Sequence, residues 1–417
     1  MNKDLIKLLI VEYQQKIPEI AVQKREFRLD DNLNYVFVGL RRAGKSYLMY
    51  RQINQLISAG HSINEMLYFN FEDDRISSLT TSDLDLIKVS YEEMYDTKPI
   101  FFLDEIQLVE KWEKFVRRLA DQKYRVYATG SNAQMLSSEI ATTLGGRFMI
   151  QEVYPYSFTE YLTSVGVDVN DRNFQYIYHK EINRAFEDFF KFGSLPEITQ
   201  VSDKRAWLSS LYQKIFWGDL LTRYQIRNDF AMRVLIRKLA ESVRQPISFN
   251  RLAQVVSVSG KKIVTDTVID YLGYLKDAWL IFQVENIHSK IAEKESNKKY
   301  YFIDNGILNL FLIDPLTALL ENQVAIFLKR NFGEEVYYYN HNIEVDFYLS
   351  EQKTAIQVSY SLKDKETKTR EINALLKISE FLPVEEMIIV TKDEDEIIST
   401  ENYQIKVVSA KNYFLFK

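Results

Sequence analysis

Cysteine is absent from the 417 residues of this chain, and histidine occurs only four times. The first absence excludes disulfide frameworks and thiolate metal sites, and the second argues against a histidine-rich metal site. The sequence also has no run of about 18 apolar residues, and it does not begin with the basic and then apolar pattern of a signal peptide. We therefore expect a cytoplasmic protein that has no membrane partner.

A strong excess of either charge is missing as well, because 53 basic and 58 acidic residues leave a formal net charge of −5. This balance argues against non-specific polyanion binding by the whole surface, so any contact with nucleic acid must come from a local patch. The length, together with 46% hydrophobic residues, predicts roughly two to four domains with ample material for their cores.

Glycine is scarce, with 13 residues in the chain, yet two glycines fall within the segment Gly-Leu-Arg-Arg-Ala-Gly-Lys-Ser at residues 39–46. An apolar run at residues 35–38 precedes the segment and a helix-like stretch follows it, which is the context of a phosphate-binding loop. We expect Lys45 to reach the β- and γ-phosphates of ATP and Ser46 to bind Mg²⁺. The residues expected to contact the nucleotide, with the role of Arg42 left open, are Gly39, Arg42, Gly44, Lys45, Ser46 and Tyr47.

A second apolar run, at residues 99–103, delivers Asp104 and Glu105 to the end of a predicted strand. Asp104 is suited to hold Mg²⁺, and Glu105 is suited to orient and polarise the attacking water. The distance of about sixty residues from the phosphate loop, across alternating strand and helix, supports reading the two motifs together. Acidic residues 72–74, after another predicted strand, are either further ligands at the same edge or solvated loop carboxylates.

The next alternation ends a predicted strand in small polar residues, which would place Ser131 or Asn132 beside the γ-phosphate, and Arg147 follows a glycine pair. Together with the Leu-Asp-Glu-Ile-Gln segment at 103–107 and the Pro-Tyr-Ser-Phe-Thr-Glu-Tyr segment at 155–161, these features resemble AAA+ ATPases. The resemblance is to an AAA_14-like core followed by a DUF4143-type region.

This resemblance implies a sensor role for Ser131 or Asn132 and an arginine-finger role for Arg147 on the nucleotide of a neighbouring subunit. Hydrolysis would then depend on a homo-oligomer, and a hexameric ring is the form most typical of the family. The alternative for Arg147 is that it neutralises a local carboxylate or is solvated.

The expected fold class is α/β, with an AAA+ P-loop core, a helical lid, a winged helix and a degenerate PD-(D/E)XK nuclease-like domain. In chain order, the expected domains are residues 1–154 for the core with its N-terminal helix, 155–228 for the lid, 229–313 for the winged helix, and 314–417 for the nuclease-like domain. In the lid, Asp219 and Arg223 match the closing helix of the resembled family, and a salt bridge across one helical turn is the interpretation we prefer.

Three predicted helices and two strands between residues 229 and 311 are typical of a winged helix, whose third helix can lie in a DNA major groove. Lysines around that helix and the wing could neutralise phosphates, and nearby acidic residues dilute them. These candidate nucleic-acid contacts are Lys261, Lys262, Lys290, Lys294, Lys298 and Lys299. Because winged helices also bind proteins, a protein partner is the alternative to DNA.

The last segment is similar to the PD-(D/E)XK nucleases, in which a helix glutamate, a strand aspartate and a Glu-X-Lys on the next strand hold metal and polarise water. Glu321 and Asp346 match the first two elements. Gln357 and Ser359 stand where the carboxylate and the lysine belong, so we predict a nuclease-like fold without nuclease activity. A migrated lysine such as Lys363 could restore that activity.

The sequence therefore predicts an ATP-hydrolysing, oligomeric AAA+ protein whose C-terminal modules bind DNA, with branched or junction DNA as one possible substrate. One alternative is a nucleotide-dependent regulatory switch that binds a protein partner through the winged helix. Another alternative is an ATP-gated nuclease.

Overall fold

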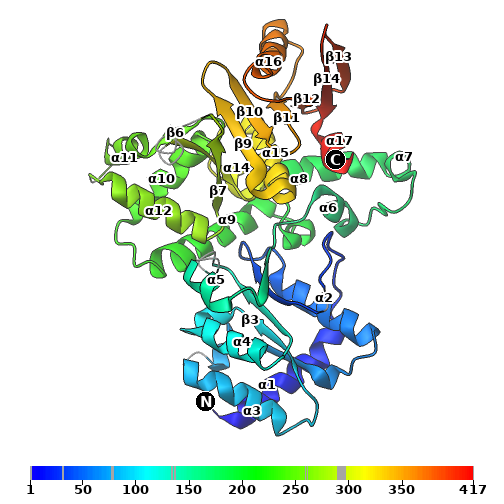
Figure 1. The fold of residues 1–417 in the computed structure, drawn as a ribbon, viewed down its shortest axis with the longest axis vertical. Coiled ribbons are helices and arrows are strands. Elements are labelled where there is room, and N and C mark those ends of the chain that lie inside the picture. Colours follow the sequence, from blue (N-terminus) through cyan, green and yellow to red (C-terminus); the bar gives the residue numbers. More distant parts are fainter. Residues whose placement is uncertain are drawn as a thin grey trace. The chain divides into compact units, whose positions relative to one another are not determined.

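The computed structural model describes residues 2–30, 32–76, 79–132, 135, 138–258, 260, 262–288 and 297–416. The chain forms two compact units, Met1–Tyr154 and Pro155–Lys417, and each is described by itself (Figure 1). In the part of the chain described, no helix is long and apolar enough to cross a membrane.

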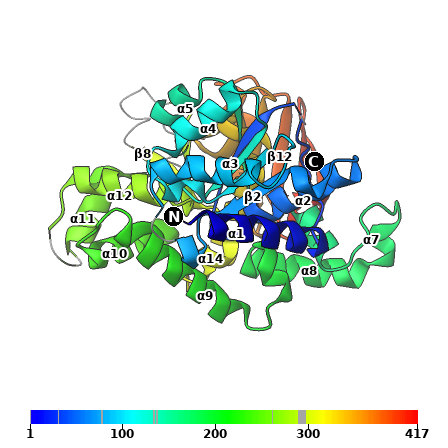
Figure 2. The ribbon, with the colours of Figure 1, turned by 90° about the horizontal axis from the view of Figure 1, so that it is seen from below.

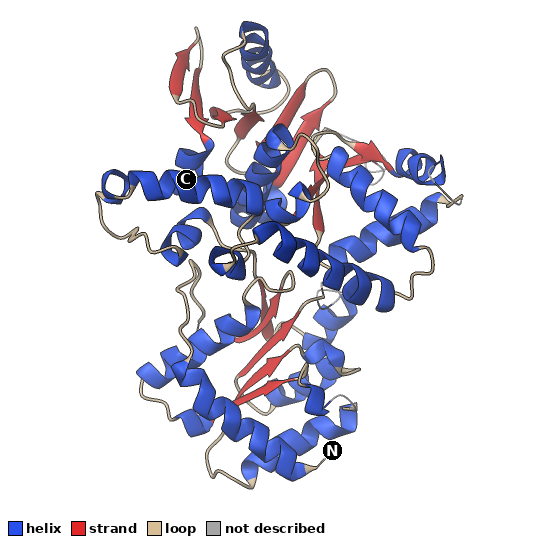
Figure 3. Ribbon diagram, turned by 180° about the vertical axis from the view of Figure 1, so that it is seen from behind, coloured by secondary structure: helices blue, strands red, loops and turns tan. Residues whose placement is uncertain are grey.

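A parallel sheet forms the centre of the first unit, and its five described strands run in the order β2-β3-β4-β1-β5. The strands are β1 Asn34–Val38, β2 Met66–Asn70, β3 Ile100–Asp104, β4 Val126–Gly130 and β5 Phe148–Glu152. Helices lie on both sides of the sheet (Figure 3), so every residue of β3 and β4 is buried. Burial on both faces is the reason these strands read as continuous apolar runs.

The helices of the first unit alternate with its strands. They are α1 Lys3–Lys16, α2 Lys45–Ser58, α3 Leu84–Glu92, α4 Trp112–Asp121 and α5 Ser138–Leu144. Helix α1 packs against β2 and α3 (Figure 2). The strands expected at 35–38 and 99–103 are confirmed, and so is a further strand that the sequence predicts at 66–71; β3 begins at Ile100, one residue later than expected. The sequence also predicts one helix over 79–95, but these residues form a shorter helix, α3, after a separate 3₁₀ turn at Thr81–Asp83 that Thr80 caps.

Helices make up the first half of the second unit. They are α6 Phe158–Ser164, α7 Phe174–Ile177, α8 His179–Phe192, α9 Lys204–Lys214, α10 Asp229–Glu241, α11 Phe249–Val258 and α12 Thr265–Asp277. The sequence predicts one helix over 207–226, where the structure has α9 followed by a π-helical segment, Ile215–Thr222. Arg223 pairs with Asp219 at 3.1 Å, which confirms the salt bridge preferred from the sequence.

A mixed sheet forms the second half of this unit, and its described strands run in the order β13-β14-β12-β11-β10-β9-β7-β8-β6. Those strands are β6 Ile247–Ser248, β7 Ile281–Asn286, β8 Asn297–Phe302, β9 Val336–Asn340, β10 Glu344–Leu349, β11 Thr354–Val358, β12 Glu386–Thr391, β13 Glu396–Ser399 and β14 Gln404–Ser409. The remaining helices are α14 Asn305–Asn309, α15 Leu316–Phe332, α16 Lys365–Ile378 and α17 Ala410–Phe416.

Strands β7 and β8 belong to two arrangements at once. With β6, α10, α11 and α12 they give the helix and strand order expected for the winged helix, in which β8 pairs with both β6 and β7. Strand β7 also pairs in parallel with β9, where Glu285 faces Tyr337. The sheet is therefore continuous across the boundary predicted between residues 313 and 314, and the domain limits inside this unit stay predictions.

Asp304 joins two segments that are far apart in the sequence of this unit. Its carboxylate is buried and accepts the N–H groups of Gly306 and Ile307, which caps α14, and the N–H group of Ser194 at 2.8 Å. A Cβ atom at Gly193, where φ is +75°, would lie 2.1 Å from the Asp304 carboxylate, so this approach requires glycine. Burial raises the pKa of Asp304 to about 6.

We expect Asp304→Ala to lower the free energy of unfolding by about 2–4 kcal/mol, because it removes a helix cap and leaves three buried N–H groups without an acceptor. Urea unfolding followed by circular dichroism measures this loss. Asp364→Ala is the control, since Asp364 caps α16 in an exposed position by accepting the N–H of Thr367. Equal losses in the two variants would contradict the role given to Asp304.

Candidate nucleotide site

The phosphate loop begins where β1 ends, and two glycines determine its path. A Cβ atom at Gly39 would lie 2.3 Å from the carbonyl oxygen of Val153, so a larger residue cannot take this position. Gly44 has the left-handed φ of +99°, and α2 begins directly after it at Lys45. The free N–H groups and the positive dipole end of α2 therefore face the loop, which suits an anion.

Lys45 is buried inside the loop. Its ammonium donates to the carbonyl oxygens of Gly39 and Leu40 at 3.1 Å each, and it lies 3.7 Å from Oε1 of Glu105. These are bonds that phosphate oxygens can replace without taking the side chain far from its present position.

Asp104 is buried at the carboxyl end of β3. The hydroxyl of Tyr68 donates to its Oδ2 at 2.5 Å, the hydroxyl of Thr129 donates to its Oδ1, and Ser46 also hydrogen-bonds to it. Burial and the neighbouring Glu105 raise the pKa of Asp104. The structure therefore brings together the two predicted Mg²⁺ ligands, and a hydroxyl beside a carboxylate is a donor set that fits this ion.

Glu105 directly follows Asp104 and has a left-handed backbone, with φ of +56°. Its N–H donates to the hydroxyl of Thr129, and its Oε2 accepts from Nε2 of Gln107 at 2.5 Å and from the N–H of Ser131 at 3.3 Å. Burial works to raise the pKa of Glu105, but Lys45 and these donors outweigh it and lower the pKa. The predicted base is thus ionised, and its oxygens are already held.

Strand β4 explains why these groups meet. It lies between β1, which carries the loop, and β3, which carries the two carboxylates. The hydroxyl of Thr129, near the end of β4, donates to the Asp104 carboxylate and accepts the backbone N–H of Glu105. Ser131 and Asn132 are buried just beyond the end of β4. The placement of Ser131 and Asn132 is compatible with a sensor role, which stays a prediction.

The remaining predicted nucleotide residues lie at the surface. Arg42 is exposed and Tyr47 has 56% of its surface exposed. Arg147 is exposed and pairs with Asp121 at 2.5 Å, which is the local carboxylate considered as the alternative from the sequence. A role for Arg147 toward another subunit stays a prediction.

Two of the acidic residues at 72–74, Glu72 and Asp73, form ion pairs in the described structure. Glu72 pairs with Arg41 of the loop at 2.9 Å. Asp73 pairs with Arg75, and the hydrogen bond from that guanidinium lowers the pKa of Asp73.

Sequence reasoning missed Tyr68 and Gln107, and it assigned Thr129 no role. Burial and the Asp104 carboxylate raise the pKa of Tyr68 well above its ordinary value, so the phenol keeps its proton and is the donor. The sequence does show a hydroxyl-bearing residue, Tyr68, inside an apolar strand. Its contact with Asp104 follows only from the pairing of β2 with β3, which the sequence does not reveal.

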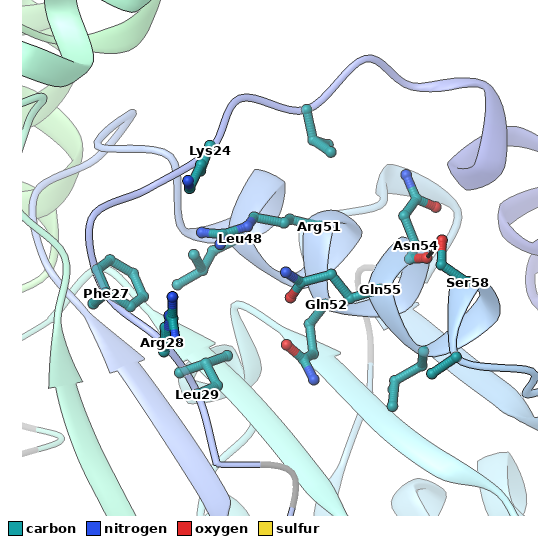
Figure 4. A pocket seen from close by; sticks show the side chains of 13 residues that line it. Lys24, Phe27, Arg28, Leu29, Leu48, Arg51, Gln52, Asn54, Gln55 and Ser58 are labelled. Atoms are coloured by element: carbon teal, nitrogen blue, oxygen red, sulfur yellow. Dashed lines mark hydrogen bonds between the residues drawn. The ribbon is translucent and has the colours of Figure 1, made fainter. Parts of the chain in front are cut away.

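A pocket of about 690 Å³ lies beside α2, between this helix and the segment at residues 22–29 (Figure 4). Among its described lining residues are Lys24, Arg28 and Arg51 but no carboxylate. Residues 39–46, all of which are described, do not line it. The phosphate site is therefore defined by the loop and not by this pocket.

Of the six lysines predicted to contact DNA, three lie within the described residues: Lys262, which is exposed, and Lys298 and Lys299. Lys261, Lys290 and Lys294 lie outside the described residues. Lys298 is buried and pairs with Glu285 at 3.1 Å, and Lys299 is fully buried. The prediction that Lys298 and Lys299 face DNA is wrong, because their positions in β8 direct them into ion pairs.

The four predicted nuclease-site residues have partners within the second unit. Lys299 contacts Glu321 and Asp346. Gln357 bonds to the backbone of β10, accepting the N–H of Asp346 and donating to the carbonyl oxygen of Glu344, while the Ser359 hydroxyl donates to the carbonyl oxygen of Ser361. Lys363 is exposed, so the cation beside the two carboxylates is Lys299 instead of the migrated lysine considered from the sequence.

A parallel sheet with a phosphate loop after β1 and a carboxylate pair after β3 defines a P-loop nucleoside triphosphatase fold. Residues 31–162 match the AAA domain family AAA_14, so this part of the chain belongs to the AAA+ ATPase family. Residues 183–317 match a domain of unknown function, DUF8612, where the sequence had led us to expect a DUF4143-type region.

Relatives with similar sequences extend over most of the chain. An uncharacterized protein of Methanocaldococcus jannaschii is 36% identical over 84% of this chain and 80% of its own length. An uncharacterized protein of Haemophilus influenzae is 28% identical over 84% of this chain and 88% of its own. Among solved structures, a Walker-type ATPase of Pyrococcus abyssi is 12% identical, covers 74% of this chain and 95% of its own, and has a TM-score of 0.43, which is too low to support a functional argument.

Tyr68→Phe is expected to raise the Mg²⁺ concentration for half-maximal ATP hydrolysis about tenfold, because Asp104 loses the donor that orients it. A magnesium titration of the hydrolysis rate measures the shift. Tyr50→Phe is the matched control, since the Tyr50 hydroxyl hydrogen-bonds to that of Tyr68 at 3.2 Å and not to Asp104. If both variants or neither shifted the titration, Tyr68 would not position Asp104.

Proposed function

We propose that this chain hydrolyses ATP with Mg²⁺ at the site formed by Lys45, Ser46, Asp104 and Glu105. The observation that carries the proposal is the convergence of a loop lysine, a hydroxyl beside a buried carboxylate, and an ionised glutamate at the carboxyl edge of one parallel sheet. These groups supply phosphate binding, metal binding and a base in one place.

Each residue has a distinct part in this reaction. Lys45 exchanges its loop carbonyls for phosphate oxygens, and the first N–H groups of α2 bind the same phosphates. Ser46 and Asp104 would hold Mg²⁺, which supplies positive charge to the transferred phosphoryl group. Glu105 orients the attacking water and accepts its proton, which requires that Glu105 exchange the Gln107 amide for the water.

We further propose that Arg147 completes the nucleotide site of a neighbouring subunit in a ring. Two observations support this arrangement: Arg147 is exposed just before β5, and it lies beside Asn34 at the start of β1, the opposite end of that strand from its own phosphate loop. In the isolated chain, Asp121 holds the guanidinium, and assembly would replace this partner by the neighbour's phosphate.

A subunit-mixing assay tests the arrangement in trans. Lys45→Ala and Arg147→Ala should each reduce ATP hydrolysis about a thousandfold, and a mixture should regain activity, because some interfaces then carry an intact loop beside an intact arginine. The control is a mixture of Arg147→Ala with the double variant Lys45→Ala, Arg147→Ala, which cannot rebuild such an interface. A mixture of the single variants that stays inactive, although sizing shows mixed assemblies, would count against the finger.

For the second unit we propose contact with DNA, with branched or junction DNA as one candidate, and coupling of that contact to ATP turnover. Two exposed cations support phosphate contact: Arg251 lies on α11, and Lys262 lies just before α12. Two buried lysines weaken the basic patch, so a regulatory switch that binds a protein partner is the second candidate. Nuclease activity is proposed to be lost, since Gln357 is committed to the backbone of β10.

The rate of ATP hydrolysis with and without linear, single-stranded and junction DNA separates the two candidates. We expect DNA to raise the rate several-fold, and we expect Arg251→Ala with Lys262→Ala to weaken DNA binding on all sequences and reduce its salt dependence by about two phosphate contacts. Glu241→Ala, which changes an exposed acidic residue of α10, is the control. Unchanged hydrolysis and no retarded DNA at low salt would favour the switch.

Mg²⁺-dependent cleavage abolished by Asp346→Ala would overturn the loss of nuclease activity.

A further inference from the structure

A lysine ammonium lies at the centre of a carboxylate cluster in the second unit. Nζ of Lys299, which is fully buried on β8, is 3.3 Å from Oε1 of Glu321, 3.2 Å from Oδ1 of Asp346 and 3.3 Å from Oε1 of Glu344. Glu321 comes from α15, and the other two carboxylates come from β10. The Lys299 ammonium therefore connects its own strand, β8, with β10 of the same sheet and with helix α15.

Glu321, which is buried, and Asp346, which is largely buried, have partners on both carboxylate oxygens. For Glu321, Oε1 also accepts the hydroxyl of Tyr301 at 2.8 Å, and Oε2 lies 3.5 Å from Arg244. For Asp346, Oδ2 accepts the N–H of Val358 at 3.0 Å. A metal ion at this point would have to displace the ammonium as well as these bonds.

The cluster needs a cation at its centre. Glu321 is buried and Asp346 is largely buried, whereas Glu344 is half-exposed. Water screens the repulsion between Glu321 and Asp346 little, and an opposite charge placed between them offsets that repulsion. Burial acts to lower the pKa of Lys299, but Glu321, Asp346 and Glu344 hold it above its ordinary value. Burial likewise raises the pKa of Glu321, and the nearby ammonium opposes that rise.

We propose that Lys299 is the resident cation of this cluster, and that its ammonium takes the position and the charge-balancing role of a divalent metal. The ammonium has three N–H donors for the three carboxylates, and its tether to β8 makes it independent of the metal supply. The second unit therefore reaches its folded state without a metal ion at Glu321 and Asp346. This inference is independent of the ATP site in the first unit.

Removing the ammonium should turn the cluster into a metal site. In the full chain without nucleotide, we expect Lys299→Ala to lower the Tm of the second unit by about 5–15 °C. Millimolar Mn²⁺ should then restore part of this loss, because three carboxylates of the vacated cluster are hard oxygen ligands. The wild-type Tm should not respond to Mn²⁺ or to EDTA. Differential scanning calorimetry measures all of these shifts.

Two further variants make the test specific. Lys298→Ala removes the adjacent buried lysine, which pairs with Glu285, so its Tm should fall without any response to Mn²⁺. Adding Asp346→Asn to Lys299→Ala should abolish the rescue. The proposal is overturned if Lys299→Ala shows no loss or no rescue by Mn²⁺, or if the wild-type protein is itself stabilised by Mn²⁺ in a manner that Asp346→Asn removes.

If Lys299→Ala does not fold, amine acetylation of the native wild-type chain gives the answer. Mass spectrometry should find that Lys299 reacts at least about tenfold more slowly than the exposed Lys262, and that Mn²⁺ does not change the rate of Lys299. Equal rates, or an increase of the Lys299 rate in Mn²⁺, would show that the ammonium does not reside in the cluster.

Discussion

The hydrogen bonds to the buried carboxylate of Asp104 are the interaction on which the nucleotide site depends. A carboxylate this deeply buried is stable only when its oxygens are bonded, and hydroxyls of Tyr68, Thr129 and Ser46 provide the bonds. These three side chains come from β2, β4 and α2, so the bonds also fix the spacing of the strands around the phosphate loop. Glu105 follows in the chain, and its position is set by the same Thr129.

The same physical rule organises the second unit. Asp304 links the break after α8 to α14 by accepting three backbone N–H groups, and Lys299 links β8 to α15 and β10. In each case a buried ionisable group is retained where several elements meet, and removing one partner leaves the others unsatisfied. In both units, buried charged groups therefore lie where several strands and helices meet, and their bonds stabilise the packing of those elements.

Local pattern was enough to predict the loop at 39–46, the carboxylate pair and the strands that carry them. Each of these depends on residues that are close in the sequence, such as an apolar run followed by a glycine or an acidic residue. The order of strands in the sheet is not a local property, and Tyr68 became meaningful only when β2 was found beside β3. Lys299 was misassigned for the same reason, since its partners come from positions 22 and more residues away.

Exposure was the other property that sequence could not supply. Lysines 298 and 299 follow a polar segment and look like part of a basic wing, yet both face inward in β8. The sequence left Arg147 open between a finger toward a neighbouring subunit and a partner of a local carboxylate, and its pairing with Asp121 depends on where α4 ends relative to β5. The phosphate loop could therefore be assigned from the sequence, whereas the exposure of a charged side chain could be assigned only from the three-dimensional structure.

Glu105→Gln gives the most direct test of Glu105 as the base, when its ATP binding and its ATP hydrolysis are measured in parallel. Glutamine keeps the size of the side chain but cannot accept the proton of the attacking water. We predict that Glu105→Gln binds ATP at least as tightly as the wild-type chain and hydrolyses it at least about a hundredfold more slowly. Hydrolysis at the wild-type rate would show that Glu105 is not the base and that the site works differently from the arrangement described.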